Sequence, residues 1–346
     1  MVRKKFHVEH VAKLGSNENP YGPSPRVLKA IAATAPDSGL YPDPACDALR
    51  GPLADALAVD PACMIFGNGS EDLLGIATHT FVSAGDEVVT MIPSFGLHIL
   101  YPQAVGAKVH AIPVREDYCA DVDKMAAAIN PRTRILFIGN PSNPVGTSIT
   151  ADGLHTLLRA AHDNMLFVFD EAYFEYACRD ASYADFFGIL RKAQTPWLLL
   201  RTFSKAYALA GLRVGYGVGS GAAIVDLMNR VRNVFNVNRI AQAAAVAALE
   251  DQAWMRHCVD STITERERMR GELVRMGYAP APSLANFLFF DAAEDAGELA
   301  KRLLTRGVIV KPWKETGYLS HVRVSVGSLE ADDQFLAALA AERGPR

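Results

Sequence analysis

The segment RTFSKAYALAGLRVGY, residues 201–216, brings together residue types that suit covalent chemistry and anion binding. Two hydroxyl side chains, Thr202 and Ser204, and the guanidinium of Arg213 can together bind a phosphate group. A lysine that lies beside cations or in an apolar pocket can lose its proton and form a Schiff base, so Lys205 is the candidate nucleophile. A single lysine is usually a solvated surface residue, and it is the neighbours of Lys205 that favour a chemical role.

A second candidate site is GNGSED, residues 67–72, which follows a short apolar run. Its glycines permit a close approach of the backbone, and Ser70 together with the free amides of a helix N-terminus can donate to an anion. An ordinary strand-to-helix turn with Ser70 as its N-cap fits the same pattern. The segment lacks the third glycine of the dinucleotide-binding motif, which disfavours a nicotinamide-dependent oxidoreductase.

Two further polar positions follow apolar runs. In GNPSNPVG, residues 139–146, two Asn-Pro pairs form a stiff turn that can hold the amide of Asn143 against a ligand oxygen. Asp170 ends the run LFVF, where a carboxylate is costly to bury unless it meets a cation or a strong donor. A plain Asn-Pro turn and helix capping by Asp170 remain as alternatives.

The elements around these positions predict an α/β fold. Runs of branched and aromatic residues alternate with stretches of helical periodicity, which is typical of a mainly parallel sheet with helices on its faces. We expect strands at 64–66, 87–92, 108–114, 134–139, 165–169, 197–201 and 214–218. Ligands bind beyond the carboxyl ends of such strands, and all four candidate positions follow one of these runs.

After about residue 221 the pattern changes. Helical segments are expected at 222–232, 239–275 and 296–306, and short strands at 286–291, 307–311 and 321–326. This clustering predicts a smaller α+β domain at the C-terminus. The first 40 or so residues, with NENPYGPSP at 17–25, are expected to begin as an irregular arm.

Composition limits the possible partners. The chain has 346 residues, half of them apolar, and a formal charge of -3 with both signs interspersed, which argues against nucleic acid and anionic membranes. Five scattered cysteines without a CxxC pair predict neither disulfides nor a metal site. No apolar run has the length of a membrane span or follows the basic start, so we expect a cytoplasmic protein that binds small molecules.

Six motifs occur together in a specific order: SNENPYGPSP, LYPDP, GNGSED, NPSNPVGT, DEAYFEY and FSKAYALAGLRVGY. In this combination the chain resembles the fold-type-I aminotransferases, and within them the histidinol-phosphate aminotransferase family. The resemblance implies a large domain with a mainly parallel seven-stranded sheet and a smaller α+β C-terminal domain. It further implies an N-terminal arm at 1–40 that contributes to the small domain and to dimer contacts, a large domain at 41–240 that binds pyridoxal 5'-phosphate, and a small domain at 241–346.

The resemblance also assigns roles to residues. It implies that Lys205 forms the Schiff base with pyridoxal 5'-phosphate, that Asp170 pairs with the ring nitrogen, and that Asn143 and Tyr173 bind the phenolic oxygen. Lys205, Asp170 and Tyr173 are thus the expected catalytic residues. The remaining cofactor contacts are expected from Gly69, Ser70, Glu71, His98, Thr202, Ser204, Arg213 and Tyr41. Tyr41 corresponds to a tyrosine that reaches the cofactor phosphate of a neighbouring subunit, which implies a homodimer with shared sites.

Substrate contacts are expected from Arg323, Asn143, Tyr21 and Lys311. Arg323, in HVRVSVG, corresponds to an arginine that holds the substrate carboxylate or phosphate, although an arginine in such a strand is ordinarily a salt-bridged surface residue. Two positions depart from the family pattern. Lys311, in VIVKPW, replaces a frequent arginine, and His98, in PSFGLHIL, stands where we expect an aromatic ring stacked over the cofactor.

The leading functional hypothesis is amino transfer between L-histidinol phosphate and 2-oxoglutarate, a step of histidine biosynthesis. An aromatic amino-acid aminotransferase is the nearest alternative, because imidazole and phenyl rings require similar pockets. A phosphothreonine-type decarboxylase, which would use the same cofactor, is a third hypothesis from another reaction class. A non-enzymatic regulator would need a DNA-binding module, for which 346 residues leave no room.

Overall fold

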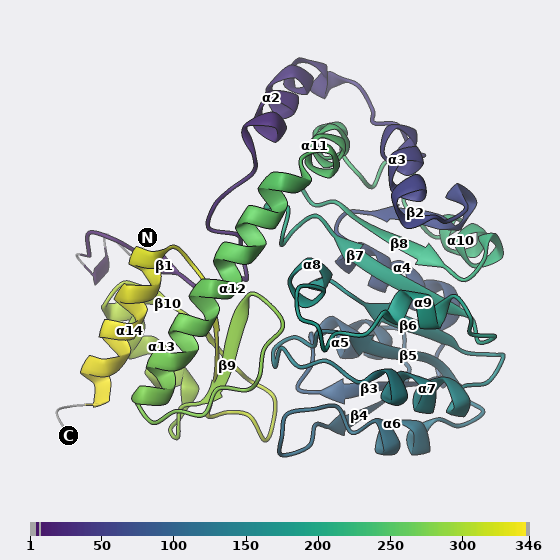
Figure 1. Ribbon diagram of the computed structural model, residues 1–346. Helices are drawn as coiled ribbons and strands as arrows, with labels where there is room; N and C mark the ends of the chain where they lie inside the picture. Colours follow the sequence, from purple (N-terminus) through teal and green to yellow (C-terminus); the bar gives the residue numbers. More distant parts are fainter. Residues whose placement is uncertain (1–4, 7, 344–346) are drawn as a thin grey trace.

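A seven-stranded sheet forms the centre of the larger part of the molecule (Figure 1). The structure, a computed structural model, describes residues 5, 6 and 8–343. The sheet order is β2-β8-β7-β6-β5-β3-β4, and only β8 runs antiparallel to its neighbours. The strands are β2 (Met64–Gly67), β3 (Glu87–Ile92), β4 (Lys108–Pro113), β5 (Thr133–Gly139), β6 (Leu166–Asp170), β7 (Trp197–Thr202) and β8 (Gly215–Gly219). The predicted α/β class and the mainly parallel sheet are confirmed.

The central strands are continuous apolar runs because both of their faces are buried. Along β5, Leu136 and Ile138 pack into one hydrophobic cluster, whereas Ile135 and Phe137 pack into the cluster on the opposite face. Side chains alternate between the two faces of a strand, so one run supplies both cores. A fully buried side chain of this kind stabilises the fold by about 2 kcal/mol.

Helices cover both faces of this sheet. One face is covered by α4 (Ser70–Phe81), α5 (Leu97–Ala104) and α10 (Ala222–Asn229). The other face is covered by α3 (Asp47–Leu57), α6 (Val122–Ala128), α7 (Ala151–Ala160), α9 (Phe186–Leu190) and α11 (Arg239–Glu250). Helix α2 (Pro25–Thr34) packs on α11 at the top of Figure 1, and the short α8 (Phe174–Ala177) follows β6.

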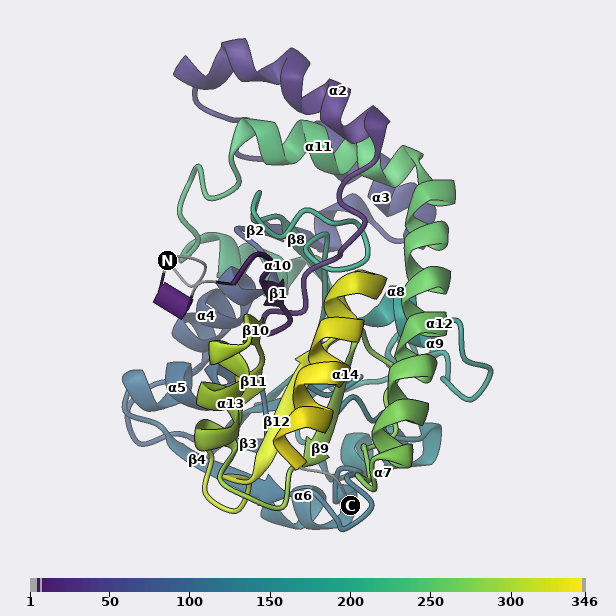
Figure 2. The same cartoon turned by 90° about the vertical axis from the view of Figure 1, so that its left-hand side faces the viewer.

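A smaller part has its own hydrophobic core. Its antiparallel sheet has the order β11-β12-β9, with β9 (Phe287–Asp291), β11 (Lys311–Pro312) and β12 (His321–Ser325). The helices α12 (Gln252–Arg275), α13 (Ala296–Thr305) and α14 (Leu329–Arg343) pack beside it, and Figure 2 shows α14 lying over the strands with α12 alongside. Ala12 and Leu14 of the N-terminal arm are buried in this core. The smaller α+β unit is therefore built from both ends of the chain, while its predicted boundaries at residues 40 and 240 stay a prediction.

Two expected elements are each divided in the structure. The helical segment at 239–275 is two helices, because Asp251 interrupts it and its side chain accepts a hydrogen bond from Trp254 N as the N-cap of α12. The strand expected at 307–311 separates into β10 (Val308–Ile309), which pairs with β1 (Ala12–Lys13), and β11, which pairs with β12. Within the described residues, no helix combines the length and apolar character needed to cross a membrane.

Candidate active site

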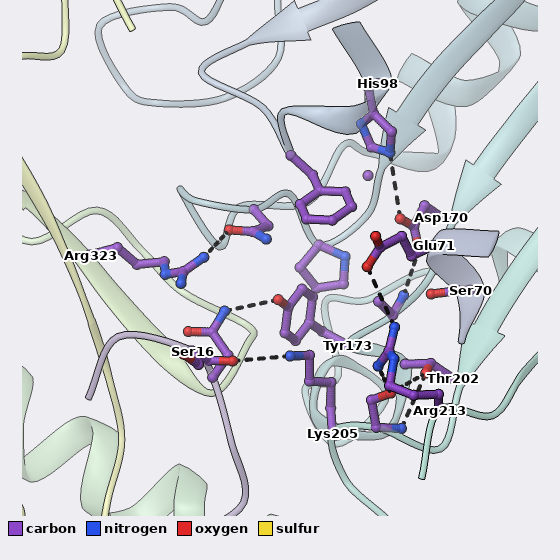
Figure 3. A pocket seen from close by; sticks show the side chains of 17 residues that line it. Ser16, Ser70, Glu71, His98, Asp170, Tyr173, Thr202, Lys205, Arg213 and Arg323 are labelled. Atoms are coloured by element: carbon purple, nitrogen blue, oxygen red, sulfur yellow. Dashed lines mark hydrogen bonds and ion pairs between the residues drawn. The ribbon is translucent and has the colours of Figure 1, made fainter. Parts of the chain in front are cut away.

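Eleven of the predicted site residues line one cavity of about 210 Å³. They are Ser70, Glu71, His98, Asn143, Asp170, Tyr173, Thr202, Ser204, Lys205, Arg213 and Arg323. The cavity lies beyond the carboxyl ends of β5, β6 and β7, and β12 of the smaller part contributes Arg323. Figure 3 shows Arg323 on the opposite side of this space from Asp170 and Arg213. Segments from both parts of the molecule therefore form a single site.

Lys205 lies in the loop after β7 and has a strongly perturbed amine. Its Nζ donates a hydrogen bond to the backbone oxygen of Ser16, at 3.2 Å. Burial, followed by the positive charges of Arg323 and Arg213, lowers the pKa of Lys205 to about 8. At pH 7 about a tenth of this amine is therefore neutral, and the neutral amine is the state required of a nucleophile or a general base.

A cluster of donors occupies the end of the cavity near the start of α4. The Thr202 Oγ1 donates to Ser204 Oγ at 2.9 Å, and Arg213 Nη1 donates to the same hydroxyl at 3.4 Å. Arg213 Nη2 also lies 3.4 Å from Glu71 Oε2. The N-terminus of α4 adds backbone amides to these side chains, so the cluster suits a phosphate group.

Gly69 is the N-cap of α4, with φ of 83°. The capping alternative for Ser70 is therefore wrong, because Ser70 is the first residue inside the helix. A Cβ atom at Gly69 would lie 2.6 Å from Arg213 Nη2. The glycine thus permits both the backbone conformation and the position of the arginine.

Asp170 ends β6 and is buried at the base of the cavity. Its Oδ1 accepts a hydrogen bond from Ala172 N at 3.1 Å, and its Oδ2 lies 3.5 Å from His98 Nε2. Helix α8 has Tyr173 as its N-cap, so Asp170 is not a helix cap. One carboxylate oxygen is held by the backbone and the other by an imidazole, which fixes the orientation of the group.

His98 lines the cavity and is held by two neighbours. Its ring stacks on Phe137, with centroids 5.3 Å apart and planes inclined by 6°, and its Nδ1 lies 3.0 Å from Ser94 Oγ. The Nε2 edge of the imidazole lies 3.5 Å from Asp170 Oδ2, and stacking of His98 over a cofactor stays a prediction. Phe95, in the same PSFGLHIL segment, also lines the cavity, and it was not predicted from the sequence. The sequence signal that could have found it is an aromatic residue three positions before His98.

Arg323 is buried without a carboxylate partner among the described residues. Its Nη1 donates to Asn143 Oδ1 at 2.6 Å and its Nη2 to the backbone oxygen of Gly15 at 2.7 Å. Burial lowers the pKa of Arg323. The surface salt bridge considered as an alternative is absent from the part of the chain that the structure describes. A buried cation with only neutral partners is suited to an anionic ligand group.

Tyr173 and the N-terminal arm complete the site. The hydroxyl of Tyr173 accepts a hydrogen bond from Asn17 Nδ2 at 2.9 Å, and burial raises the pKa of Tyr173. Asn17 and Ser16 belong to the motif SNENPYGPSP, but no site role was predicted for either of them. The arm therefore contacts Lys205, Tyr173 and Arg323 through successive residues.

Four predicted residues lie outside the cavity lining. Gly69 lies against the guanidinium of Arg213, which its lack of a side chain leaves room for. Tyr41 is 77 % exposed and stacks on Phe235, with centroids 4.5 Å apart. Tyr21 is partly exposed beside His257. Lys311 is exposed, yet it pairs with Arg323 across β11 and β12, so the two side chains share one face of the small sheet.

Comparison with known proteins shows the family to which the chain belongs. The model of the family described as aminotransferase class I and II matches residues 9–339. Histidinol-phosphate aminotransferase 3 of Rhizobium meliloti is 46% identical over 338 residues, which covers 98% of this chain and 91% of that relative. The histidinol-phosphate aminotransferase of Moorella thermoacetica is 38% identical, with 98% and 87% covered. The chain therefore belongs to the class I and II aminotransferases, and the resemblance to the histidinol-phosphate aminotransferase family is confirmed.

A solved structure has the same fold. The histidinol-phosphate aminotransferase from Sinorhizobium meliloti, in complex with pyridoxal-5'-phosphate, superposes with a TM-score of 0.91 at 30% sequence identity. The comparison covers 98% of this chain and 92% of that protein. The fold predicted from the motifs is therefore confirmed over nearly the whole chain.

Proposed function

We propose that this aminotransferase uses pyridoxal 5'-phosphate to transfer the amino group of L-histidinol phosphate to 2-oxoglutarate, in histidine biosynthesis. The observation that carries the proposal is the convergence of Lys205, Asp170 and the donors around Arg213 on one cavity. The names of the relatives at 46% and 38% identity support the choice of amino donor.

The residues of the cavity fit this cofactor. The hydroxyls of Thr202 and Ser204, the guanidinium of Arg213 and the α4 N-terminus would hold its phosphate. Asp170 would pair with its ring nitrogen and Lys205 would bond to it covalently. His98 would pack against its ring, and Phe95, which lines the same cavity, would be a second aromatic contact. When bound, pyridoxal 5'-phosphate supplies a conjugated ring that accepts the electron pair released at the alpha carbon of the substrate.

The protein groups then have separate tasks. The negative charge of Asp170 would stabilise a proton on the ring nitrogen of the bound cofactor, and His98, 3.5 Å from Asp170, would keep that carboxylate in position. Neutral Lys205 accepts the proton from the alpha carbon of the substrate and later returns one, as a general acid and base. Because burial raises the pKa of Tyr173, its hydroxyl stays protonated and can donate to an oxygen.

Arg323 would bind the anionic group of each substrate. Its guanidinium already has two neutral oxygen partners, so an incoming carboxylate or phosphate adds the missing negative charge. Lys311 lies on the same face of the small sheet and would add a second positive charge toward a phosphate. Tyr21, which is partly exposed near the arm, is proposed as a further substrate contact.

A homodimer is part of the proposal. Exposed apolar side chains gather on α2 and on segments beside α11, among them Leu28, Leu40, Tyr41, Val234 and Phe235. Such a surface is suited to burial against a second copy of the chain. Tyr41, which is exposed and does not line the cavity of its own chain, would reach the phosphate end of the partner site. The expected solution mass is that of a dimer, and a monomer at micromolar concentration would contradict the proposal.

The cytoplasmic location stays a prediction.

A side-by-side screen of amino donors tests the reaction. We expect the highest kcat/KM with L-histidinol phosphate and 2-oxoglutarate, with a visible spectrum confirming bound cofactor. A much larger value for phenylalanine or tyrosine would favour an aromatic amino-acid aminotransferase instead. Release of carbon dioxide without formation of a keto acid would point to a phosphothreonine decarboxylase.

A further inference from the structure

Glu315 lies in the loop between β11 and β12, where the smaller part contacts the larger one. One carboxylate oxygen, Oε2, accepts a hydrogen bond from Trp313 Nε1 at 2.7 Å and from the backbone N of Ser94 at 3.3 Å. Ser94 belongs to the segment between β3 and α5, which is more than 200 residues away in the sequence. A single oxygen atom thus joins the two parts of the molecule.

Each neighbour of Glu315 leads to a different end of the active site. On one side, the Arg323 guanidinium lies over the Trp313 ring, 6.0 Å from its centroid. On the other side, Ser94 Oγ lies 3.0 Å from His98 Nδ1, and His98 Nε2 lies 3.5 Å from Asp170 Oδ2. The contacts form a continuous path from Arg323 through Glu315 to Asp170.

We infer that Glu315 is a positioning residue that couples the anion-binding Arg323 to Asp170 across the contact between the two parts. This inference deepens the proposed function and rests on it. Loss of the Glu315 oxygen frees the Trp313 ring that supports Arg323, and it also frees the Ser94 segment that orients His98. Both ends of the site therefore loosen together, although Glu315 lines neither of them.

The surroundings of Glu315 indicate that its carboxylate makes a specific contact and is not an ordinary solvated surface charge. Glu315 is half-buried, and burial raises its pKa; the two N–H donors compensate for the partial loss of contact with water. A neighbouring contact, from Tyr318 Oη to the backbone oxygen of Ile92 at 3.3 Å, joins the same two loops without leading to Arg323 or His98. Tyr318 therefore offers an internal comparison.

The experiment compares Glu315→Ala, Glu315→Gln and Tyr318→Phe in the holoenzyme, with Glu298→Ala as a matched control on the exposed face of α13. Within the part of the chain that the structure describes, the Glu298 side chain forms one ion pair, with the exposed Lys301 at 2.6 Å. We measure KM for the amino donor, the dissociation constant for pyridoxal 5'-phosphate, and hydrogen exchange of the peptide spanning residues 92–98.

For Glu315→Ala we expect KM and the cofactor dissociation constant each to rise about tenfold, with faster exchange at Ser94, because two hydrogen bonds are lost. Glu315→Gln should stay within about twofold, since its amide oxygen can accept the same two bonds. Tyr318→Phe should raise exchange in the 92–98 peptide while leaving both constants within about twofold. If the alanine variant fails to fold, Trp313→Phe serves in its place: it keeps an aromatic ring, removes the N–H donor to Glu315, and should raise KM for the amino donor with a smaller change in the cofactor dissociation constant.

Several outcomes would overturn the inference. Faster exchange in Glu315→Ala with both constants unchanged would show that the contact is only structural. If Glu315→Gln raises KM and the cofactor dissociation constant as much as Glu315→Ala does, acceptance of the two hydrogen bonds by the side-chain oxygen is not what positions the site. If the wild-type protein transaminates no donor, the proposed function fails, while the cofactor constant and the exchange data still decide whether Glu315 is linked to the Asp170 end.

Discussion

The two sides of the active site are built in different ways. The cofactor side, from Lys205 to Arg213, comes from adjacent residues of one loop together with the ends of β6 and α4. The substrate side joins Gly15, Asn143 and Arg323, which lie far apart in the sequence. The first side is held by a sheet buried on both faces, whereas the second depends on how the smaller part rests against the larger one.

Under the proposed function, this difference separates the residues that carry out the reaction from those that select the substrate. Strand ends in a packed sheet place reacting groups with little freedom, which favours catalysis. A site shared between two parts can change its amino donor through substitutions in the small sheet, without disturbing the lysine or the phosphate end. Four experiments, taken from the largest expected effect to the smallest, test this division.

Replacement of Lys205 should have the largest effect. Lys205→Ala removes both the covalent attachment point and the general base, so kcat should fall by about 10,000-fold. Single-turnover kinetics with saturating cofactor and donor measure this directly. A matched control is Lys301→Ala on the exposed surface of α13, which should retain full activity. A Lys205→Ala protein that still forms a borohydride-reducible adduct and turns over would refute the assignment.

Replacement of Arg323 should affect substrate selection more than cofactor chemistry. Arg323→Met keeps most of the buried volume and removes the charge, and we expect kcat/KM to fall roughly 100-fold, because a charge-assisted pair is lost. Cofactor affinity should change by no more than a few fold, because Arg323 lies across the cavity from the phosphate end. Parallel titrations with donor and cofactor check this, and an equal loss of both would contradict the division into two sides.

The cofactor side was largely predictable from the sequence, whereas the substrate side was predictable only in part, because Asn143 and Arg323 were expected there and the backbone partner Gly15 was not. Lys205, Thr202, Ser204 and Arg213 stand within one segment, so their proximity follows from the chain itself. Asp170 and Asn143 follow strands whose apolar pattern places them at one edge of the sheet. The order of the motifs indicated the family, and the resemblance then assigned the other cofactor contacts. The structure places these residues around one cavity.

Other features depend on tertiary contacts that no local pattern contains. The break at Asp251 arises because α11 packs on α2 and α3 while α12 runs to the smaller sheet. Exposed Lys311 and the backbone partner of Arg323 likewise depend on the pairing of β11 with β12 and on the position of the arm. The Glu315 contact joins residues more than 200 positions apart.

A pH series tests whether the two sides communicate electrostatically. Because burial and the charges of Arg323 and Arg213 lower the pKa of Lys205 to about 8, its neutral fraction rises as pH increases through that value. Cofactor attachment to the apoprotein should therefore be about tenfold faster at pH 9 than at pH 7. In Arg323→Met one positive charge is absent, so the midpoint should move to higher pH. Stopped-flow absorbance measures both pH profiles. An unchanged midpoint in Arg323→Met would show that the charge of Arg323 does not affect the pKa of Lys205.

The smallest expected effect, at His98, distinguishes stacking from orientation. Because the ring packs on Phe137 and its Nε2 lies 3.5 Å from Asp170 Oδ2, we expect His98→Phe to weaken cofactor retention about fivefold through loss of this contact with the carboxylate. His98→Gln, which can still direct an amide N–H at the carboxylate, should lose less. Stacking over the cofactor predicts the reverse order, since phenylalanine would preserve it and glutamine would not. Equilibrium dialysis of the cofactor, with thermal unfolding as the control for stability, decides between the two roles.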